Sequence, residues 1–172
     1  DIQLTLDLNQ QLVAEEVLKD KKAGAIIVMD PRDGAIKAMT SKPTFDLNFF
    51  SKEFKPEKEY NELFFSEKKP LFNRALNAYD PGSVWKIVTA LAGLESGKFP
   101  ADILLETKPC ITYGSQCFRE HNDLGFGFIG YEDALRVSSN TFFYQVGYGV
   151  GVDEIYKISQ KLGFSQLSGI EL

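Results

Sequence analysis

The chain has 172 residues, of which 44% are hydrophobic and 25% are charged, and its formal net charge at pH 7 is −5. This length and balance are typical of a globular domain with a sizeable core and argue against an intrinsically disordered chain. The mixed charges provide no basic stripe for a nucleic-acid partner, and the apolar runs are shorter than the roughly 18 residues of a membrane-spanning helix.

The N-terminal residues predict a strand followed by a helix. Apolar and polar residues alternate over positions 2–8, a pattern that indicates a half-buried strand. Asn9 is placed to cap a helix that ends near Lys19, and this cap puts Leu8 and Val13 at the two positions of a hydrophobic staple. No basic segment precedes an apolar stretch here, so we expect no signal peptide in these residues.

A β-hairpin is predicted next, over residues 24–40. A nearly continuous apolar run over 24–30 forms the first arm, and the turn-forming residues 30–34 lead to a second arm over 35–40. Residues 41–80 show no clear periodicity, and a connection of this length is usually functional or disordered. Its phenylalanines favour an ordered segment that packs against another element.

The C-terminal half is predicted to be mostly helical. Asp80 is placed as the N-cap, and Pro81 as the first residue, of a helix that ends near Leu94. Residues 101–130 are expected to form a loop with short strands. Three further helices are predicted over 133–137, 141–146 and 152–162, with Gly163 as the C-cap of the last.

The predicted helix at Pro81 carries a Ser-x-x-Lys motif, Ser83 and Lys86. Residues three apart on a helix share a face, so Lys86 can reach the Ser83 hydroxyl near a helix N-terminus that favours negative charge. A serine becomes a good nucleophile when a base takes its proton, and Lys86 can be that base if burial or neighbouring cations lower its pKa. The motif is short, however, and Ser66 and Lys69 also match it in a charged, solvated stretch.

A second motif, Ser-x-Asn, is formed by Ser138 and Asn140 at the expected start of a helix. Serine and asparagine are also preferred N-cap residues, so an ordinary helix cap is the simpler explanation for this motif alone. Together with Ser-x-x-Lys it matches a constellation found in serine β-lactamases and penicillin-binding proteins.

Longer strings extend this match along the whole chain, in order. They are 4–8 with Gln11, 24–31 with Gly34 and 38–39, 41–48, Pro70 with 73–75, 81–86, 134–135, 138–140, 142–144, 163–164 and 169–172. On these strings the chain resembles class B penicillin-binding proteins, and most closely their elongation-type penicillin-binding protein 2 group. Trp85 departs from the pattern, because a smaller or different residue is common there.

The resemblance implies the penicillin-recognising serine transpeptidase fold, an α/β (α+β) domain with helices on both faces of an antiparallel sheet. Ser83 would attack the D-Ala-D-Ala carbonyl of a peptidoglycan stem peptide with Lys86 as base and without a cofactor, and a neighbouring stem amine would resolve the acyl-enzyme. Ser138 would relay a proton to the leaving amine, and Asn140 would orient Lys86. Ser83, Ser138 and Asn140 would contact the substrate, and the Ser83 N–H would form half of the oxyanion hole.

The family's third motif, Lys-Ser/Thr-Gly, does not occur in this sequence. In the family it lies on a strand that supplies the second oxyanion N–H and the cation for the substrate carboxylate. We therefore expect residues 1–172 to be the N-terminal part of a transpeptidase domain without the third-motif strand, the C-terminal helix or the membrane anchor. Such a fragment would be impaired as an enzyme and prone to self-association.

Cys110 and Cys117 match a two-cysteine pattern that some family members carry before the second motif. Those members often have Gly-His-Gly after it, whereas this chain has Phe126 between the two glycines, which argues against a zinc site. Three alternatives stay open: a disulfide, two free thiols, and a metal site that adds His121 or Asp123.

The resemblance also implies a place on the extracytoplasmic, periplasmic face of a bacterial cell membrane. The implied partners are peptidoglycan stem peptides, β-lactam antibiotics and proteins of the cell-elongation machinery. Two other functions compete with this interpretation. A serine β-lactamase-like hydrolase is disfavoured by the first hairpin and by residues 45–48, and a non-catalytic scaffold is disfavoured by the intact motif residues.

Overall fold

The computed structural model describes residues 3–170 and divides the chain into two compact units, which meet between Tyr79 and Asp80 in the sequence. Ile2, in the predicted strand, and residues 171–172, in the last matching string, lie outside the described residues. Helices and antiparallel strands are both present, which confirms the mixed α/β class. Among the described residues, none of the helices has the length and apolar character needed to cross a membrane.

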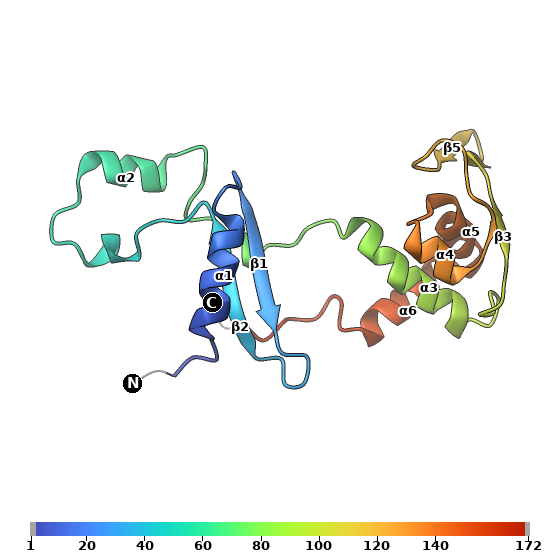
Figure 1. The fold of residues 1–172 in the computed structure, drawn as a ribbon, viewed down its shortest axis with the longest axis horizontal. Coiled ribbons are helices and arrows are strands. Elements are labelled where there is room, and N and C mark those ends of the chain that lie inside the picture. The colour runs from blue at the N-terminus through green and yellow to red at the C-terminus, as the bar shows by residue number, and fades with distance from the viewer. Residues whose placement is uncertain (1–2, 171–172) are drawn as a thin grey trace. The chain divides into compact units, whose positions relative to one another are not determined.

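The first unit contains a helix that lies along a hairpin (Figure 1). The elements are α1 (Leu8–Leu18), β1 (Gly24–Met29) and β2 (Ile36–Lys42). The strands pair antiparallel from Gly24 with Lys42 to Val28 with Ala38, so the predicted hairpin is confirmed. The Lys42 ammonium donates to the carbonyls of Leu18 and Lys19, and in this way the hairpin caps the C-terminus of α1.

The predicted strand at the N-terminus is wrong, because residues 3–7 form no strand and α1 begins at Leu8. The cap is Asp7 rather than Asn9, since the Asp7 carboxylate accepts a hydrogen bond of 3.0 Å from the Gln10 N–H. Leu8 thus lies inside the helix with 72% of its surface exposed, and the staple with Val13 does not form.

The residues that precede and open α1 instead cover the outer edge of β2. The Asp7 N–H donates to the Lys37 carbonyl at 2.8 Å, and the Thr5 hydroxyl donates to the Ile36 carbonyl at 2.7 Å. The Gln11 side-chain amide bonds the N–H and the carbonyl of Met39, at 2.9 and 3.1 Å. The backbone groups on this edge of the hairpin therefore have hydrogen-bond partners from within the same unit.

The connection after the hairpin is ordered, as its phenylalanines indicated. It holds the 3-10 helices η1 (Leu47–Ser51) and η2 (Arg74–Leu76) and the helix α2 (Glu57–Phe64), none of which was predicted. Phe49 is buried with its ring 6.4 Å from that of Phe64. Lys52 joins η1 to α2 through ion pairs with Asp46 and Glu59, at 3.3 and 2.8 Å.

The second unit consists of a helical core with short strands beside it (Figure 1). Its elements are η3 (Gly82–Val84), α3 (Trp85–Glu95), β3 (Leu105–Thr107), β4 (Cys110–Tyr113), β5 (Gln116–Arg119), β6 (Gly127–Ile129), α4 (Tyr131–Arg136), α5 (Asn140–Val150) and α6 (Val152–Lys161). β3 pairs with β6, and β4 pairs with β5, both antiparallel. The short strands over 101–130 and the three later helices are confirmed, although α5 is longer than predicted.

The core of this unit is centred on α5. Phe142 and Val146 are fully buried there, against a cluster that includes Val88 and Ala92 of α3. A Cβ placed on Gly93 of α3 would collide with the Tyr131 hydroxyl and the Val146 side chain, so this glycine allows the close approach of α3 to its neighbours.

Two helix ends test the predicted caps. Asp80 does not cap the helix at Pro81, because a 3-10 turn over 82–84 comes first and α3 begins at Trp85 without a side-chain cap. At the end of α6, Gly163 adopts a φ of 84° and its N–H bonds the Gln160 carbonyl at 3.0 Å. The predicted glycine C-cap of α6 is therefore confirmed.

Candidate active site

The structure brings the two sequence motifs together around one ammonium group. The Lys86 Nζ lies 2.6 Å from the carbonyl oxygen of Ser138, 3.0 Å from its Oγ and 2.7 Å from the Oδ1 of Asn140. The partners are more than fifty residues away in the sequence, so α3 and α5 must pack together to form the cluster. These contacts join Lys86 of the first motif to both polar residues of the second.

Ser83 lies one helical turn before Lys86, in η3, and its side chain is exposed. The three described hydrogen bonds of the Lys86 ammonium all go to Ser138 and Asn140, and none of them goes to Ser83. The nucleophile candidate is therefore open to an incoming substrate, while the base candidate is held by the second motif. Catalytic hydrogen bonds are often long before a substrate is bound, so this geometry is compatible with proton transfer from Ser83.

Ser138 owes its position to an unusual backbone conformation. It stands just after α4 with a φ of 55°, the left-handed region in which glycine is the usual residue. The Ser138 N–H donates to the Leu135 carbonyl at 3.1 Å, and the Ser139 N–H donates to the Ala134 carbonyl at 2.8 Å. This bonding closes α4 and turns both oxygens of Ser138 toward Lys86.

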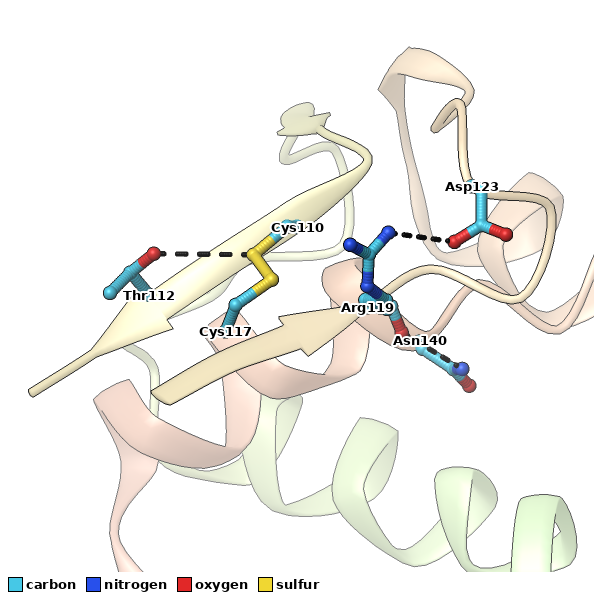
Figure 2. Close-up of a disulfide and its surroundings, with 6 residues drawn as sticks. All are labelled: Cys110, Thr112, Cys117, Arg119, Asp123 and Asn140. Atoms are coloured by element: carbon cyan, nitrogen blue, oxygen red, sulfur yellow. Dashed lines mark hydrogen bonds and ion pairs between the residues drawn. A yellow bond between two sulfur atoms is a disulfide. The ribbon is translucent and has the colours of Figure 1, made fainter. Parts of the chain in front are cut away.

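Asn140 opens α5, and its side chain is fixed at both ends. Its Nδ2 donates to the Arg119 carbonyl at 3.3 Å (Figure 2). The Oδ1 is left to face Lys86. The N-cap of the helix is Ser139, whose Oγ accepts from the Phe142 N–H at 3.2 Å. The simple helix-cap explanation thus applies to Ser139, and it leaves the side chains of Ser138 and Asn140 free for Lys86.

The pKa of Lys86 is lowered from its ordinary value, because burial disfavours the charged ammonium. The negative charge of Glu120 acts in the opposite direction and raises the pKa. A lowered pKa increases the neutral fraction of the lysine at a given pH, as a general base requires.

Glu120 is a member of this site that the sequence did not indicate. Its side chain is buried, with 2% of the residue exposed. The carboxylate accepts hydrogen bonds from the Ser139 hydroxyl at 2.6 Å, the Asn140 N–H at 2.7 Å, the Thr141 N–H and hydroxyl at 3.0 and 2.9 Å and the His121 N–H at 3.0 Å. Burial alone would raise its pKa, but these donors together lower the pKa to about 2.

No sequence pattern marks Glu120, because a single acidic residue in an irregular segment has no characteristic spacing. The only signal was its place between the cysteine pair and the second motif.

The cysteine segment forms the β4–β5 hairpin, in which Cys110 and Cys117 are joined by a disulfide with a Cα–Cα distance of 5.8 Å (Figure 2). The other two candidate ligands have different partners. His121 Nε2 lies 2.8 Å from the Val137 carbonyl oxygen, and Asp123 accepts from Arg119 at 3.1 Å. The structure therefore does not bring Cys110, Cys117, His121 and Asp123 together as a ligand set.

The second Ser-x-x-Lys match has a different environment. The Ser66 hydroxyl accepts from the Lys68 N–H at 3.2 Å, and Lys69 has an exposed side chain and a φ of 51°. Ser66 lines a pocket of about 590 Å³ between η1 and α2, which contains none of the residues of the Lys86 cluster. This copy is a local turn in the first unit.

Comparison with known families gives one match to most of the chain. The model of the "Penicillin binding protein transpeptidase domain" matches residues 24–172. A curated relative, "Peptidoglycan D,D-transpeptidase MrdA" of Salmonella typhimurium (strain SL1344), is 34% identical over 175 aligned positions, which cover 100% of this chain and 28% of the relative. The chain thus spans little more than a quarter of the length of this relative.

Solved structures show the same likeness. The chain is similar to Pseudomonas aeruginosa PBP2 in complex with WCK 5153, with a TM-score of 0.87 and 32% identity over 95% of this chain and 36% of that one. It is also similar to PBP2 in a complex with MreC from Helicobacter pylori, with a TM-score of 0.86 and 30% identity over 94% of this chain and 30% of that one.

Proposed function

This chain belongs to the penicillin-binding protein transpeptidase family, and we propose that it forms the nucleophile-bearing part of a peptidoglycan D,D-transpeptidase. The single observation that carries this proposal is the contact of the Lys86 ammonium with Ser138 and Asn140, at 2.6–3.0 Å. It joins the base candidate, which lies one turn after Ser83, to both residues of the second motif.

In this reaction, the Lys86 amine takes the proton of Ser83 as the Ser83 Oγ attacks the carbonyl carbon of the penultimate D-Ala of a stem peptide. The peptide bond to the terminal D-Ala breaks, and Ser138 relays a proton to the leaving amine. The amine of a neighbouring stem then attacks the Ser83 ester, so a new peptide bond forms and the serine recovers its proton. Asn140 holds the substrate amide and orients Lys86.

The tetrahedral intermediates of both steps place negative charge on the carbonyl oxygen. The N–H of Ser83 would stabilise this charge as one half of an oxyanion hole. Because no Lys-Ser-Gly or Lys-Thr-Gly occurs among the 172 residues, we propose that the second half and the cation for the substrate carboxylate come from a segment outside this sequence. Residues 1–172 would then be the N-terminal part of the transpeptidase domain and would react slowly by themselves.

The proposed partners follow from the family and from its relatives. β-Lactams would acylate Ser83 in place of the stem peptide, and stem peptides in the periplasm, at the membrane, would be the natural substrate. A similar protein has been solved in a complex with MreC. We therefore propose that the protein containing this chain also works with proteins of the cell-elongation machinery.

The test is intact-mass analysis of the full-length protein that contains this chain, after incubation with a β-lactam. We expect one covalent adduct, which is lost in Ser83→Ala and retained in the matched control Ser66→Ala. An adduct that persists in Ser83→Ala would overturn the assignment of the nucleophile. Rapid turnover of the β-lactam would instead support a β-lactamase-like hydrolase, and failure of the wild-type protein to form any adduct would support a scaffold.

A further inference from the structure

We propose that Glu120 is a positioning residue for acylation: its carboxylate holds the first turn of α5 and thereby fixes Asn140 and Ser138 against Lys86. This inference rests on the function proposed above and adds to it a residue outside the two motifs. Glu120 follows β5, so a part of the chain remote from Ser83 would control the geometry of its base.

The position of Glu120 explains how α5 starts. The first N–H groups of a helix have no partners within the helix and need an acceptor from elsewhere. Here the Asn140 and Thr141 N–H groups donate to the Glu120 carboxylate, and the Phe142 N–H donates to the Ser139 Oγ, which itself donates to Glu120. A negative charge also complements the positive end of the helix dipole.

Asn140 transmits this constraint to Lys86. Its N–H lies 2.7 Å from a Glu120 oxygen, and its Oδ1 lies 2.7 Å from the Lys86 Nζ. Ser138 is held through its two neighbours in the chain. The Ser139 hydroxyl bonds Glu120, and the His121 ring bonds the Val137 carbonyl. Displacement of Glu120 would therefore move both partners of the ammonium at once.

The five groups that converge on Glu120 are all donors, and an ionised carboxylate offers only acceptors. A glutamine would present an NH₂ group to some of these donors, so at least one buried hydrogen bond would be lost. Bonds to a charged acceptor are also stronger than bonds to a neutral one. The site is thus built for a carboxylate, and Glu120→Gln is a specific probe with little change in size.

The charge of Glu120 has a second, electrostatic effect. Two titratable groups lie near it: Lys86 on α3, whose ammonium it favours, and the next residue in the chain, His121, whose Nε2 lies 4.0 Å away. The donors from α5 are uncharged. Loss of the negative charge would lower the pKa of Lys86 further, and the neutral base would then persist to lower pH.

The test is the rate of acylation by a β-lactam as a function of pH, measured on the full-length protein and on its Glu120→Gln and Glu120→Asp variants. We expect the plateau rate of Glu120→Gln to fall roughly 10- to 100-fold, because small misplacements of catalytic groups have effects of this size. We also expect the acidic limb of its profile to move to lower pH. Glu120→Asp keeps the charge but is shorter, so its plateau should fall while its limb stays near the wild-type position.

The matched control is Glu132→Gln, which removes the same charge from an exposed position on α4 and should leave plateau and limb unchanged. A folded Glu120→Gln variant with a wild-type profile would overturn the proposal. If Glu120→Gln does not fold, Glu120→Asp provides the test. A wild-type plateau rate in that variant would overturn the proposal, because it would show that the placement of the carboxylate is unimportant. Absence of acylation in the wild-type protein would refute the transpeptidase function itself, so the two failures are distinguishable.

Discussion

Ser138 combines a structural demand with a chemical one. Its left-handed backbone, with a φ of 55°, suits glycine, whereas its side chain and carbonyl both contact Lys86. A residue other than glycine in this conformation costs about 1–2 kcal/mol. Such strain agrees with the role proposed for Ser138, which needs its hydroxyl.

The left-handed backbone and the hydroxyl of Ser138 lead to opposite expectations for the stability and the acylation rate of a Ser138→Gly variant. Ser138→Gly should raise the free energy of unfolding by about 1 kcal/mol relative to Ser138→Ala, because glycine relieves the left-handed backbone. Both variants lack the hydroxyl, so both should acylate more slowly than the wild-type protein. Thermal unfolding and β-lactam acylation rates measure the two effects, and equal stability of the glycine and alanine variants would contradict the argument.

At the scale of single residues, the sequence predicts those site residues that lie close together in a short motif. Ser83 with Lys86 and Ser138 with Asn140 each lie within one turn of chain, so their motifs are visible without a fold. The resemblance implied that Asn140 orients Lys86, and the structure has a contact between these two side chains. Glu120 could not be predicted, because its importance comes from donors on α5 that only tertiary packing brings to it.

The β4–β5 hairpin is the element that carries Glu120 to α5. The disulfide crosses it between Cys110 and Cys117 (Figure 2), and the Glu120 N–H donates to the Pro109 carbonyl at its base, at 2.9 Å. Its tip is anchored to α5 by Tyr113, whose ring stacks on that of Tyr148 with centroids 4.3 Å apart. The hairpin is thus closed at its base, crosslinked between its two strands and docked at its tip.

We expect the two cysteines to be paired in the protein under oxidising conditions, as they are in the structure. Titration of the oxidised, unfolded protein should then find no free thiol, whereas two free thiols would refute the pairing. Reduction should lower the free energy of unfolding by about 2–3 kcal/mol at most, since the crosslinked loop is short. The double variant Cys110→Ser/Cys117→Ser is the control, because its stability should not respond to a reductant.

Elements with strong local patterns were predicted well, and elements defined by partners were not. The hairpin of β1 and β2 follows from two apolar arms and a turn. The alternation over residues 3–7 predicted a strand, and this prediction was wrong. These residues instead bond the edge of β2, and Asp7 caps α1. Helix α2 was missed because its surface is largely polar and its N-terminus has no side-chain cap.

On the scale of the whole chain, an apolar groove of about 320 Å³ lies between α1 and β1. Val13 and Val17 line it and are 64% and 58% exposed, and Ile26 and Val28 of β1 form its other side. Exposed apolar surface of this kind promotes association. We expect the groove to be buried when the chain meets another apolar surface.

We therefore expect the 172-residue chain to self-associate when it is produced alone. Light scattering should show species larger than a monomer, and Val13→Glu with Val17→Lys should reduce their amount because charges oppose burial of the groove. Glu16→Gln, on the same helix but outside the groove, is the matched control and should leave association unchanged. A wild-type chain that remains monomeric at high concentration would contradict the prediction.

The contacts of Lys86 have a consequence for the order in which the protein folds. They join residues 52 and 54 positions apart, whereas the disulfide joins residues separated by 7. Closing the longer loop loses more chain entropy, and contacts distant in sequence generally slow folding. We therefore expect the proposed base for Ser83 to be assembled late, and we expect a newly made chain to stay unreactive toward a β-lactam until α3 and α5 have docked. Recovery of acylation during refolding should accordingly lag behind the recovery of helical structure.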